Sequence, residues 1–368
     1  MDNLDALMAV AAPDPYGYYE RLGAERPFAF EPSIKAWVAA SAPAVEAALA
    51  HPALSVRPAA EPVPKTIVGA TLGDVFGRLA RMNDGERHRA LRDMVCRRIN
   101  GWTARAVSTT AAGHAQLLSK ALATGSATLH DYLHGVPALT VASLIGLHEV
   151  PALADLIGDF ARAFAPGADQ ERADRGDRAV QQLAGRCPAF ESEDARANAI
   201  GLLFQSYEAT AALVGNTLAL LMTDETLQAM ASRDGAVLEG LLERVARYDP
   251  PVHNTRRFAA KDAEILGQAV RAGDAVLVVM AAANRDPRAT HSYSFGFGPH
   301  TCPGMSTAVS IARTALRCLL EAQLPLSHYA VAGYHPSLNV RSPILLKRLA
   351  HERSGVANVA SVDKAGMK

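Results

Sequence analysis

The chain has 368 residues, of which 49% are hydrophobic and 20% charged, and its 37 Lys plus Arg balance 37 Asp plus Glu. This composition is typical of a globular protein with a large core, arranged as one large domain or two average ones. The balanced charge disfavours nucleic acid and anionic membranes as partners, and the longest apolar run, 275–283, is too short to span a bilayer.

Two further features indicate the cellular compartment. The residues at the N-terminus, 1–5, lack the basic region of a signal peptide. The cysteines are scattered without the spacing of a disulfide framework, which fits a reducing cytosol. They are Cys96, Cys187, Cys302 and Cys318. We therefore expect a cytoplasmic protein.

The beginning of the chain predicts a small mixed segment. Residues 16–25 predict a helix, the alternating apolar residues of 28–40 predict a hairpin, and 42–50 predict a second helix that ends at His51-Pro52. Three prolines between residues 58 and 64, without periodicity, indicate a loop.

A further helix is predicted to begin near Asn83 or Asp84, since either side chain can cap it, and to continue to about residue 95. His88 and Arg92 are four residues apart and share one face of this helix. Taken alone, the pair is interpreted as part of a solvated basic face, because other arginines are present in the same segment.

The middle of the chain is predicted to be predominantly helical. Segments 104–147 and 151–184 are alanine-rich with helical apolar spacing, and Ala165-Pro166-Gly167 breaks the second one. The longest helical pattern, 194–222, contains no proline. Its centre carries four polar residues, which on an ordinary buried helix are as often structural as functional. They are Gln205, Ser206, Glu208 and Thr210.

Beyond this helix the pattern changes to short helices and strands. Residues 238–248 predict a helix that ends before a double proline, and a strand is predicted to begin at 254–257. Residues 264–280 predict a hairpin with its turn at 272–274. Terminal strands are expected within 325–349, and residues 355–368 are expected to form a disordered tail.

The most distinctive stretch is the loop 294–304, which places Cys302 among glycines and prolines directly before a helix predicted from Met305 to about Leu320. Free backbone N–H groups at a helix start favour thiolate, and a thiolate in such a loop suits a heme iron as axial ligand. An inert buried cysteine is the plainer alternative. A zinc site is disfavoured because His300-x-Cys302 lacks the usual spacer and no second Cys pair is near.

The pattern Phe-Gly-x-Gly-x-His-x-Cys-x-Gly from Phe295 to Gly304 resembles the heme-ligand loop of the cytochrome P450 family, position for position. The resemblance implies that Cys302 is the iron ligand of heme b (iron protoporphyrin IX) and that His300 binds a heme propionate. It also implies that His88 and Arg92 share one propionate and that Arg257 contacts the second. Phe295 and Gly304 complete the implied cofactor-binding residues.

The chain departs from the family's pattern at two helices. The family's central helix has Ala-Gly-x-(Asp/Glu)-Thr, where this chain has Gln205-Ser206-Tyr207-Glu208-Ala209. The acid is retained as Glu208, the threonine is replaced, and Thr210 is one residue, or about 100° of helix, further on. The resemblance therefore gives a candidate catalytic group of Glu208, Ser206, Gln205 and Thr210.

In the Glu-x-x-Arg helix, Arg244 occupies the glutamate position. Glu243, at i,i+4 from Arg247, is expected to form the ion pair in its place. The segment before the cysteine loop is also shorter than is usual in the family.

The expected fold is mainly α with small β-sheets, a P450-like heme-thiolate fold in one catalytic domain, 1–354. The resemblance implies a monooxygenase of bacterial secondary metabolism that oxidises a small molecule with dioxygen and electrons from a ferredoxin-type partner. Because Ala209 replaces the threonine, peroxide use, coupling or rearrangement is an alternative reaction. A degenerate, heme-free binding module is a second alternative, which the basic residues disfavour.

Overall fold

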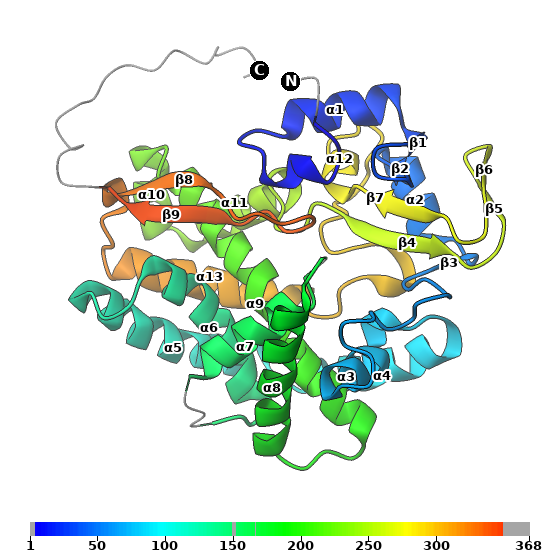
Figure 1. Cartoon of the computed structure of the whole chain (residues 1–368). Coiled ribbons are helices and arrows are strands. Elements are labelled where there is room, and N and C mark those ends of the chain that lie inside the picture. The colour runs from blue at the N-terminus through cyan, green and yellow to red at the C-terminus, as the bar shows by residue number, and fades with distance from the viewer. Residues whose placement is uncertain (1–3, 149–151, 166, 349–368) are drawn as a thin grey trace.

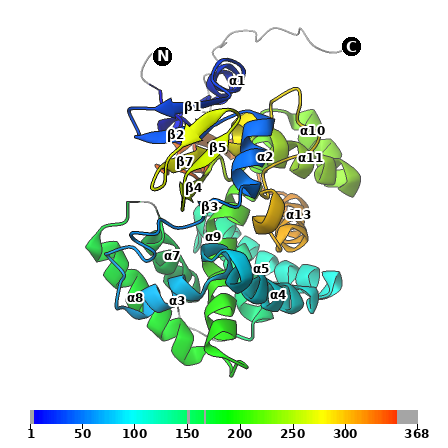
Figure 2. The same cartoon turned by 90° about the vertical axis from the view of Figure 1, so that its right-hand side faces the viewer.

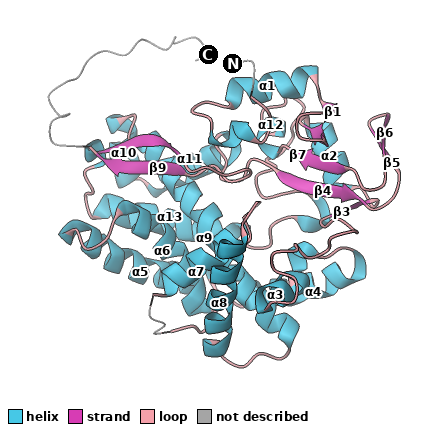
Figure 3. Cartoon of the chain, viewed as in Figure 1, coloured by secondary structure: helices cyan, strands magenta, loops and turns pink. Residues whose placement is uncertain are grey.

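The computed structural model describes residues 4–148, 152–165 and 167–348. Helices dominate the fold (Figure 3). They are α1 (Tyr16–Glu25), α2 (Ala42–Ala50), α3 (Thr71–Arg78), α4 (Gly85–Asn100), α5 (Ala104–Thr124), α6 (Leu129–Leu144), α7 (Leu153–Ala163), α8 (Gln170–Arg186), α9 (Glu193–Leu221), α10 (Glu225–Arg233), α11 (Gly235–Tyr248), α12 (Met280–Ala283) and α13 (Met305–Glu321). The strands are β1 (Phe28–Glu31), β2 (Ala36–Ala39), β3 (Leu54–Ser55), β4 (Thr255–Ala259), β5 (Ala263–Ile265), β6 (Gln268–Val270), β7 (Ala275–Val278), β8 (Tyr329–Tyr334) and β9 (Pro343–Lys347). The mainly helical fold with small sheets is confirmed.

One side of the molecule is built on a five-stranded sheet in the order β1-β2-β7-β4-β3. Strand β7 is central and pairs parallel with β2, so its side chains are buried on both faces. Val276 and Val278 pack in the cluster that includes residues of α2, whereas Leu277 packs with α1. The apolar run of the sequence is therefore explained by a strand covered on both faces.

The other side is a helical layer organised around α9, which has 29 residues and is therefore about 43 Å long. Its N-cap is Ser192, whose side chain accepts a hydrogen bond from the Ala195 N–H. Helices α6, α7, α11 and α13 all contact α9, and α4 crosses near its N-terminal half. Figure 1 and Figure 2 show the sheet on one side of the molecule and α9 among the helices of the other side.

The helices predicted at 16–25, 42–50, 194–222 and 238–248 are confirmed, with ends that agree within three residues. The predicted hairpin at 264–280 is wrong in its pairing. Strands β5 and β6 form a short hairpin about Leu266 and Gly267, which both have positive φ, and β7 leaves it to join the central sheet. Burial of β7 between α1 and α2 outweighs local pairing. Helices α3, α10 and α12 were not predicted.

Parts of several expectations lie outside the described residues: Pro151 at the start of one helical segment, Pro166 in the break after α7, and the expected tail at 355–368. Within the described ranges, no helix is long and apolar enough to cross a membrane.

The start and the end of the described chain are joined through Arg341, of which only 1% is exposed. Its guanidinium donates to the carbonyl oxygens of Val10, Ala12 and Pro13 at 3.1, 2.6 and 2.9 Å. Its Nε lies 3.1 Å from the Oδ1 of Asp249, at the end of α11. One buried cation therefore holds three distant segments together.

Candidate functional site

The cysteine loop takes its shape from two glycines. Gly296 and Gly298 have φ angles of +78° and +67°, in the left-handed region that side chains disfavour. A Cβ at Gly296 would also lie 3.1 Å from the His300 carbonyl oxygen. The Cys302 N–H donates to the Phe295 carbonyl oxygen at 2.7 Å, which closes the loop and fixes the cysteine ahead of α13.

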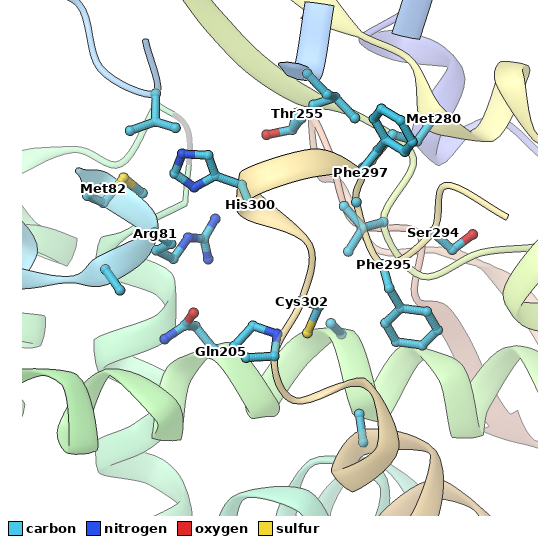
Figure 4. Close-up of a pocket in the computed structure, with 18 of the residues that line it drawn as sticks. Arg81, Met82, Gln205, Thr255, Met280, Ser294, Phe295, Phe297, His300 and Cys302 are labelled. Carbon is cyan, nitrogen blue, oxygen red and sulfur yellow. The ribbon is translucent and has the colours of Figure 1, made fainter. Parts of the chain in front are cut away.

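Cys302 opens into a cavity of about 320 Å³ between the sheet side and the helical side. The walls come from α2, α4, α9, β4, α12, the cysteine loop and the short helix η2 (Ala80–Met82). Figure 4 shows Cys302, Phe295, His300, Arg81 and Gln205 around the same space. The cavity brings together residues that are more than 200 positions apart in the sequence.

One end of the cavity is basic. His88, Arg92, Arg257 and His300 all line it, and His88 stacks on His300 with ring centroids 4.0 Å apart. Arg92 donates to the Thr301 carbonyl oxygen at 2.7 Å, so α4 is bonded to the cysteine loop. The four residues that the resemblance assigned to the propionates therefore meet at one place.

Asp84 is the acidic neighbour of this basic end. Its carboxylate lies 3.2 Å from His300 Nε2 and accepts the Val56 N–H at 3.0 Å. Burial opposes its ionisation, but these two hydrogen bonds hold the pKa of Asp84 below its usual value. Asp84 is the N-cap residue of α4, as expected, although its side chain makes no capping bond.

The basic groups are more numerous than the acidic ones. Arg257 is 5% exposed and its guanidinium bonds to the carbonyl oxygen of Arg256 at 2.9 Å. Burial lowers the pKa of Arg257 to about 10, and burial also lowers the pKa of His88 to about 4. Neither Arg92 nor Arg257 has an ion-pair partner in the described part of the chain. The cavity can therefore accept an anionic group.

The wall opposite Cys302 is formed by α9. Ala209, Thr210 and Gln205 line the cavity, and Gln205 Nε2 donates to the Gly201 carbonyl oxygen at 2.8 Å. The Thr210 hydroxyl makes no hydrogen bond to another described residue. Thr210, which follows Ala209 by about 100° of helix, lies on the lining beside it.

Glu208 and Ser206 do not belong to the cavity lining. The Ser206 hydroxyl donates to the Leu203 carbonyl oxygen at 2.9 Å, within its own helix. Burial raises the pKa of Glu208, with Arg162 of α7 opposing that rise. Both residues are turned away because each helical residue advances the side-chain direction by about 100°.

The Cys302 thiol differs from what the helix start alone predicted. Burial raises its pKa, although the Gly304 N–H and the charges of Arg81 and Arg92 oppose that rise. Desolvation thus opposes the thiolate that the helix start favours, although the Cys302 side chain is exposed to the cavity. Cys302 is nonetheless the one cysteine among the four that lines the cavity.

The expected Glu243–Arg247 ion pair does not form. Glu243 is exposed, and the Arg247 Nε is buried without a hydrogen-bond partner. The end of α11 is held instead by Asn284, whose Nδ2 donates to the Arg247 carbonyl oxygen and to Ser294 Oγ. The Asn284 Oδ1 accepts the Tyr293 N–H at 2.7 Å. An amide therefore joins α11 to the segment before the cysteine loop.

Sequence reasoning missed Arg81, which lines the cavity from η2. Three arginines precede His88 within the segment 78–87, and nothing in their spacing distinguishes the one that turns inward. Sequence reasoning also missed the structural role of Asn284. No three His, Cys, Asp or Glu side chains gather as a metal site would need within the ranges that the structure describes.

Comparisons with known proteins give partial sequence matches and nearly complete structural ones. No family model matches the chain. It is 37% identical over 134 residues to 6-deoxyerythronolide B hydroxylase of Saccharopolyspora erythraea, which is 33% of each chain. It is 29% identical over 206 residues to cytochrome P450 144 of Mycobacterium tuberculosis, covering 52% of this chain and 46% of that one. The chain thus spans half or less of the length of these curated relatives.

The structural matches concern the fold. The crystal structure of P450BioI with a ligated acyl carrier protein has a TM-score of 0.75 at 20% identity, covering 92% of this chain and 98% of that one. The crystal structure of CalO2 has a TM-score of 0.76 at 22% identity, covering 94% and 98%. The expected heme-thiolate fold is thereby confirmed. The fold is therefore that of cytochrome P450 structures, and the partial sequence matches include proteins named as cytochromes P450.

Proposed function

We propose that this protein is a heme-thiolate monooxygenase, formed by a single catalytic domain of residues 1–354, that oxidises a small organic molecule. The observation that carries the proposal is the placement of Cys302 opposite α9, across a cavity with a basic end. Relatives named as a hydroxylase and as monooxygenases support the same reaction class. We further propose that the enzyme acts in secondary metabolism, in the cytoplasm. It would use dioxygen and receive electrons from a separate ferredoxin-type protein.

The residues present fit heme b. A flat group with two carboxylates needs donors at one edge, and the buried guanidinium of Arg257 together with Arg92 offers forked donors without acidic partners. His88 and His300 would complete this edge, and Cys302 would be the thiolate ligand. Phe295 would flank the cofactor, and Gly304 would leave room beside the sulfur. When bound, heme supplies reductive activation of dioxygen, which a thiolate ligand assists.

The chain's own residues would bind and orient the substrate against the α9 wall and supply protons there. The Thr210 Oγ1 and the Gln205 amide are the polar groups of α9 on the lining, so they are the proposed proton donors or relays. Glu208, buried with a raised pKa and outside the lining, and Ser206, bonded to its own helix, would act only through these neighbours or water.

A second candidate reaction rests on Ala209, which lines the cavity where the family's threonine would stand. A methyl group cannot donate a proton, so direct use of peroxide, coupling or rearrangement remains the alternative chemistry. The heme-free binding module is disfavoured because a domain without heme would bury Arg257 with no ion-pair partner among the described residues and with Asp84 alone as an acidic neighbour of several basic groups.

The test is the absorbance spectrum of the purified, reduced protein with carbon monoxide. We expect a thiolate-type spectrum for the wild type and for Cys96→Ala, Cys187→Ala and Cys318→Ala, and its loss in Cys302→Ala. A heme-free wild type would establish the binding module instead. An unchanged spectrum in Cys302→Ala would show that another group ligates the iron.

A further inference from the structure

Arg81 has no role in the function proposed above, yet it lines the cavity. It lies in η2, between α3 and α4, and Figure 4 shows its guanidinium group beside the space that Gln205, His300 and Cys302 surround. Its guanidinium carbon is 5.7 Å from the centre of the Phe204 ring, on α9. Arg81 therefore belongs to the α9 side of the cavity as well as to its basic end.

The backbone around Arg81 is fixed by two buried asparagines. Asn198 of α9 accepts the Ala80 N–H at 2.8 Å and donates to the Arg78 carbonyl oxygen at 2.8 Å. Asn83 donates to the Leu79 carbonyl oxygen at 2.8 Å. These two side chains are 4% and 8% exposed. The arginine is thus presented from a rigid support, as binding residues need to be.

The charge of Arg81 is not compensated by a carboxylate. No acidic side chain pairs with it in the described part of the chain. Four other basic residues already face the position proposed for the two cofactor carboxylates. Arg81 is consequently a fifth basic group on the lining, and its exposed side chain is available to an anion that enters the cavity.

We propose that Arg81 binds the carboxylate of an anionic substrate and orients it against the α9 wall. This inference rests on the proposed function and names its substrate class. A planar guanidinium binds a carboxylate through two parallel hydrogen bonds, and its single positive charge matches one carboxylate better than a phosphate monoester that carries nearly two negative charges. The apolar residues Leu202, Ala209 and Leu213 of the lining provide a surface for the organic part of the acid.

The experiment compares octanoate with octan-1-ol, which share a chain length and differ in charge. Binding to the purified full-length protein is measured by calorimetry and by the shift of the heme absorbance band. The variants are Arg81→Gln, which removes the charge, and Arg81→Lys, which keeps the charge but loses the fork. Arg89→Gln on exposed α4 surface is the matched control. Octyl phosphate is a third probe.

We expect the wild type and Arg89→Gln to bind octanoate more tightly than octan-1-ol. Arg81→Gln should lose octanoate affinity by about 10- to 100-fold, as the loss of charge-assisted hydrogen bonds implies, with octan-1-ol affinity and heme content unchanged. Arg81→Lys should be intermediate. Calorimetry reports the subsite even where the heme spectrum is absent, so failure of the proposed function and failure of this inference are distinguishable.

Three results would overturn the inference. An equal affinity of the wild type for the two probes would show that no anion subsite exists. A lower heme content in Arg81→Gln, with the octanoate preference retained, would assign Arg81 to a cofactor carboxylate. Tighter binding of octyl phosphate than of octanoate would assign the site to phosphate monoesters.

Discussion

Ala209 is the residue at which the cavity wall differs most from the pattern of the family. Ala209 belongs to α9 and lines the same cavity as Cys302. The polar residues of this helix nearest to it on the lining are Thr210 and Gln205. Proton delivery from this wall therefore depends on side chains one and four residues away from position 209. General acid catalysis typically contributes about 10²- to 10⁴-fold to a rate, so the displacement is expected to be measurable.

We predict that Ala209→Thr increases product formed per reducing equivalent with substrates that lack a hydroxyl near the oxidised carbon. Gln205→Ala and Thr210→Val should decrease it. The measurement follows product, reducing equivalents and released hydrogen peroxide together. Ser206→Ala is the control, because that hydroxyl is bonded to the Leu203 carbonyl oxygen. Tight coupling in the wild type that none of these changes affects would mean that protons arrive by another route.

His134 is a buried histidine away from the cysteine loop. It is 8% exposed, its Nδ1 lies 3.1 Å from the His130 carbonyl oxygen, and its ring is 4.8 Å from that of Tyr207. Burial lowers the pKa of His134 to about 3 from the usual 6.5. The unfolded chain binds a proton at this residue between these pH values and the folded protein does not.

The free energy of unfolding should therefore fall as the pH drops from about 6.5 toward 3, by up to about 1.4 kcal/mol per pH unit for this one residue. His134→Leu should make that dependence shallower by the same amount in denaturant titrations at several pH values. His148→Gln, at an exposed position, is the control. An identical slope in His134→Leu and wild type would refute the assignment.

At the scale of elements, the junction of α11 with the cysteine loop is held by an amide where the family uses an ion pair. Asn284 joins the Arg247 carbonyl oxygen to Ser294 and Tyr293, while the Arg247 Nε remains without a partner. An unpaired buried donor costs about 1–3 kcal/mol. A partner for the Arg247 Nε would therefore raise the free energy of unfolding.

Arg244→Glu should recover part of that free energy. A glutamate at 244 is three residues before Arg247 on the same helix, within reach of an ion pair. We expect the free energy of unfolding to rise by about 1 kcal/mol, measured by denaturant titration, and heme release to slow. Arg244→Gln separates the causes, since an equal gain there would come from removing a repulsion between arginines.

The sequence predicts best those elements whose conformation is determined by residues close to one another in the chain. The Gly296 and Gly298 positions need left-handed backbone, and a glycine pattern records that need directly. The long run of α9 without proline is equally local. In contrast, Glu243 satisfied the spacing rule for Arg247 but lies on the exposed face of α11, which only packing against the rest of the molecule decides.

The candidate site divides in the same way. Five residues that short motifs predicted all line one cavity: Cys302, His300, His88, Arg92 and Arg257. Arg81 has no motif, because the backbone beside it, at Arg78 and Ala80, is held by hydrogen bonds to Asn198 more than a hundred residues later. The rise in the pKa of the Cys302 thiol also depends on desolvation by distant segments, which the sequence does not display.

At the scale of the whole molecule, Arg341 joins segments that are far apart in the sequence. Its buried guanidinium bonds Val10, Ala12 and Pro13 to Asp249. Arg341→Met should lower the free energy of unfolding by about 1–3 kcal/mol or more, because buried carbonyl oxygens of the N-terminal segment would lose their donor.

The measurement for Arg341→Met is denaturant unfolding, with Arg317→Met as the matched control. Arg317 pairs with Glu321 in an exposed i,i+4 bridge, and such pairs contribute between about 0 and 1 kcal/mol. An equal decrease in the free energy of unfolding in both variants would show that the buried hydrogen bonds of Arg341 stabilise the fold no more than an exposed ion pair does.

The central strand has a consequence for how this chain is made on the ribosome. Trp37 in β2 pairs with Val276 in β7, about 240 residues later. At a synthesis rate of about 5–20 residues per second, the β1–β2 hairpin waits between about 12 and 50 seconds for its partner strand. During that interval α5 to α9, which contact near neighbours, can already assemble. The nascent hairpin meanwhile presents an unpaired edge, the feature most prone to wrong association with other chains.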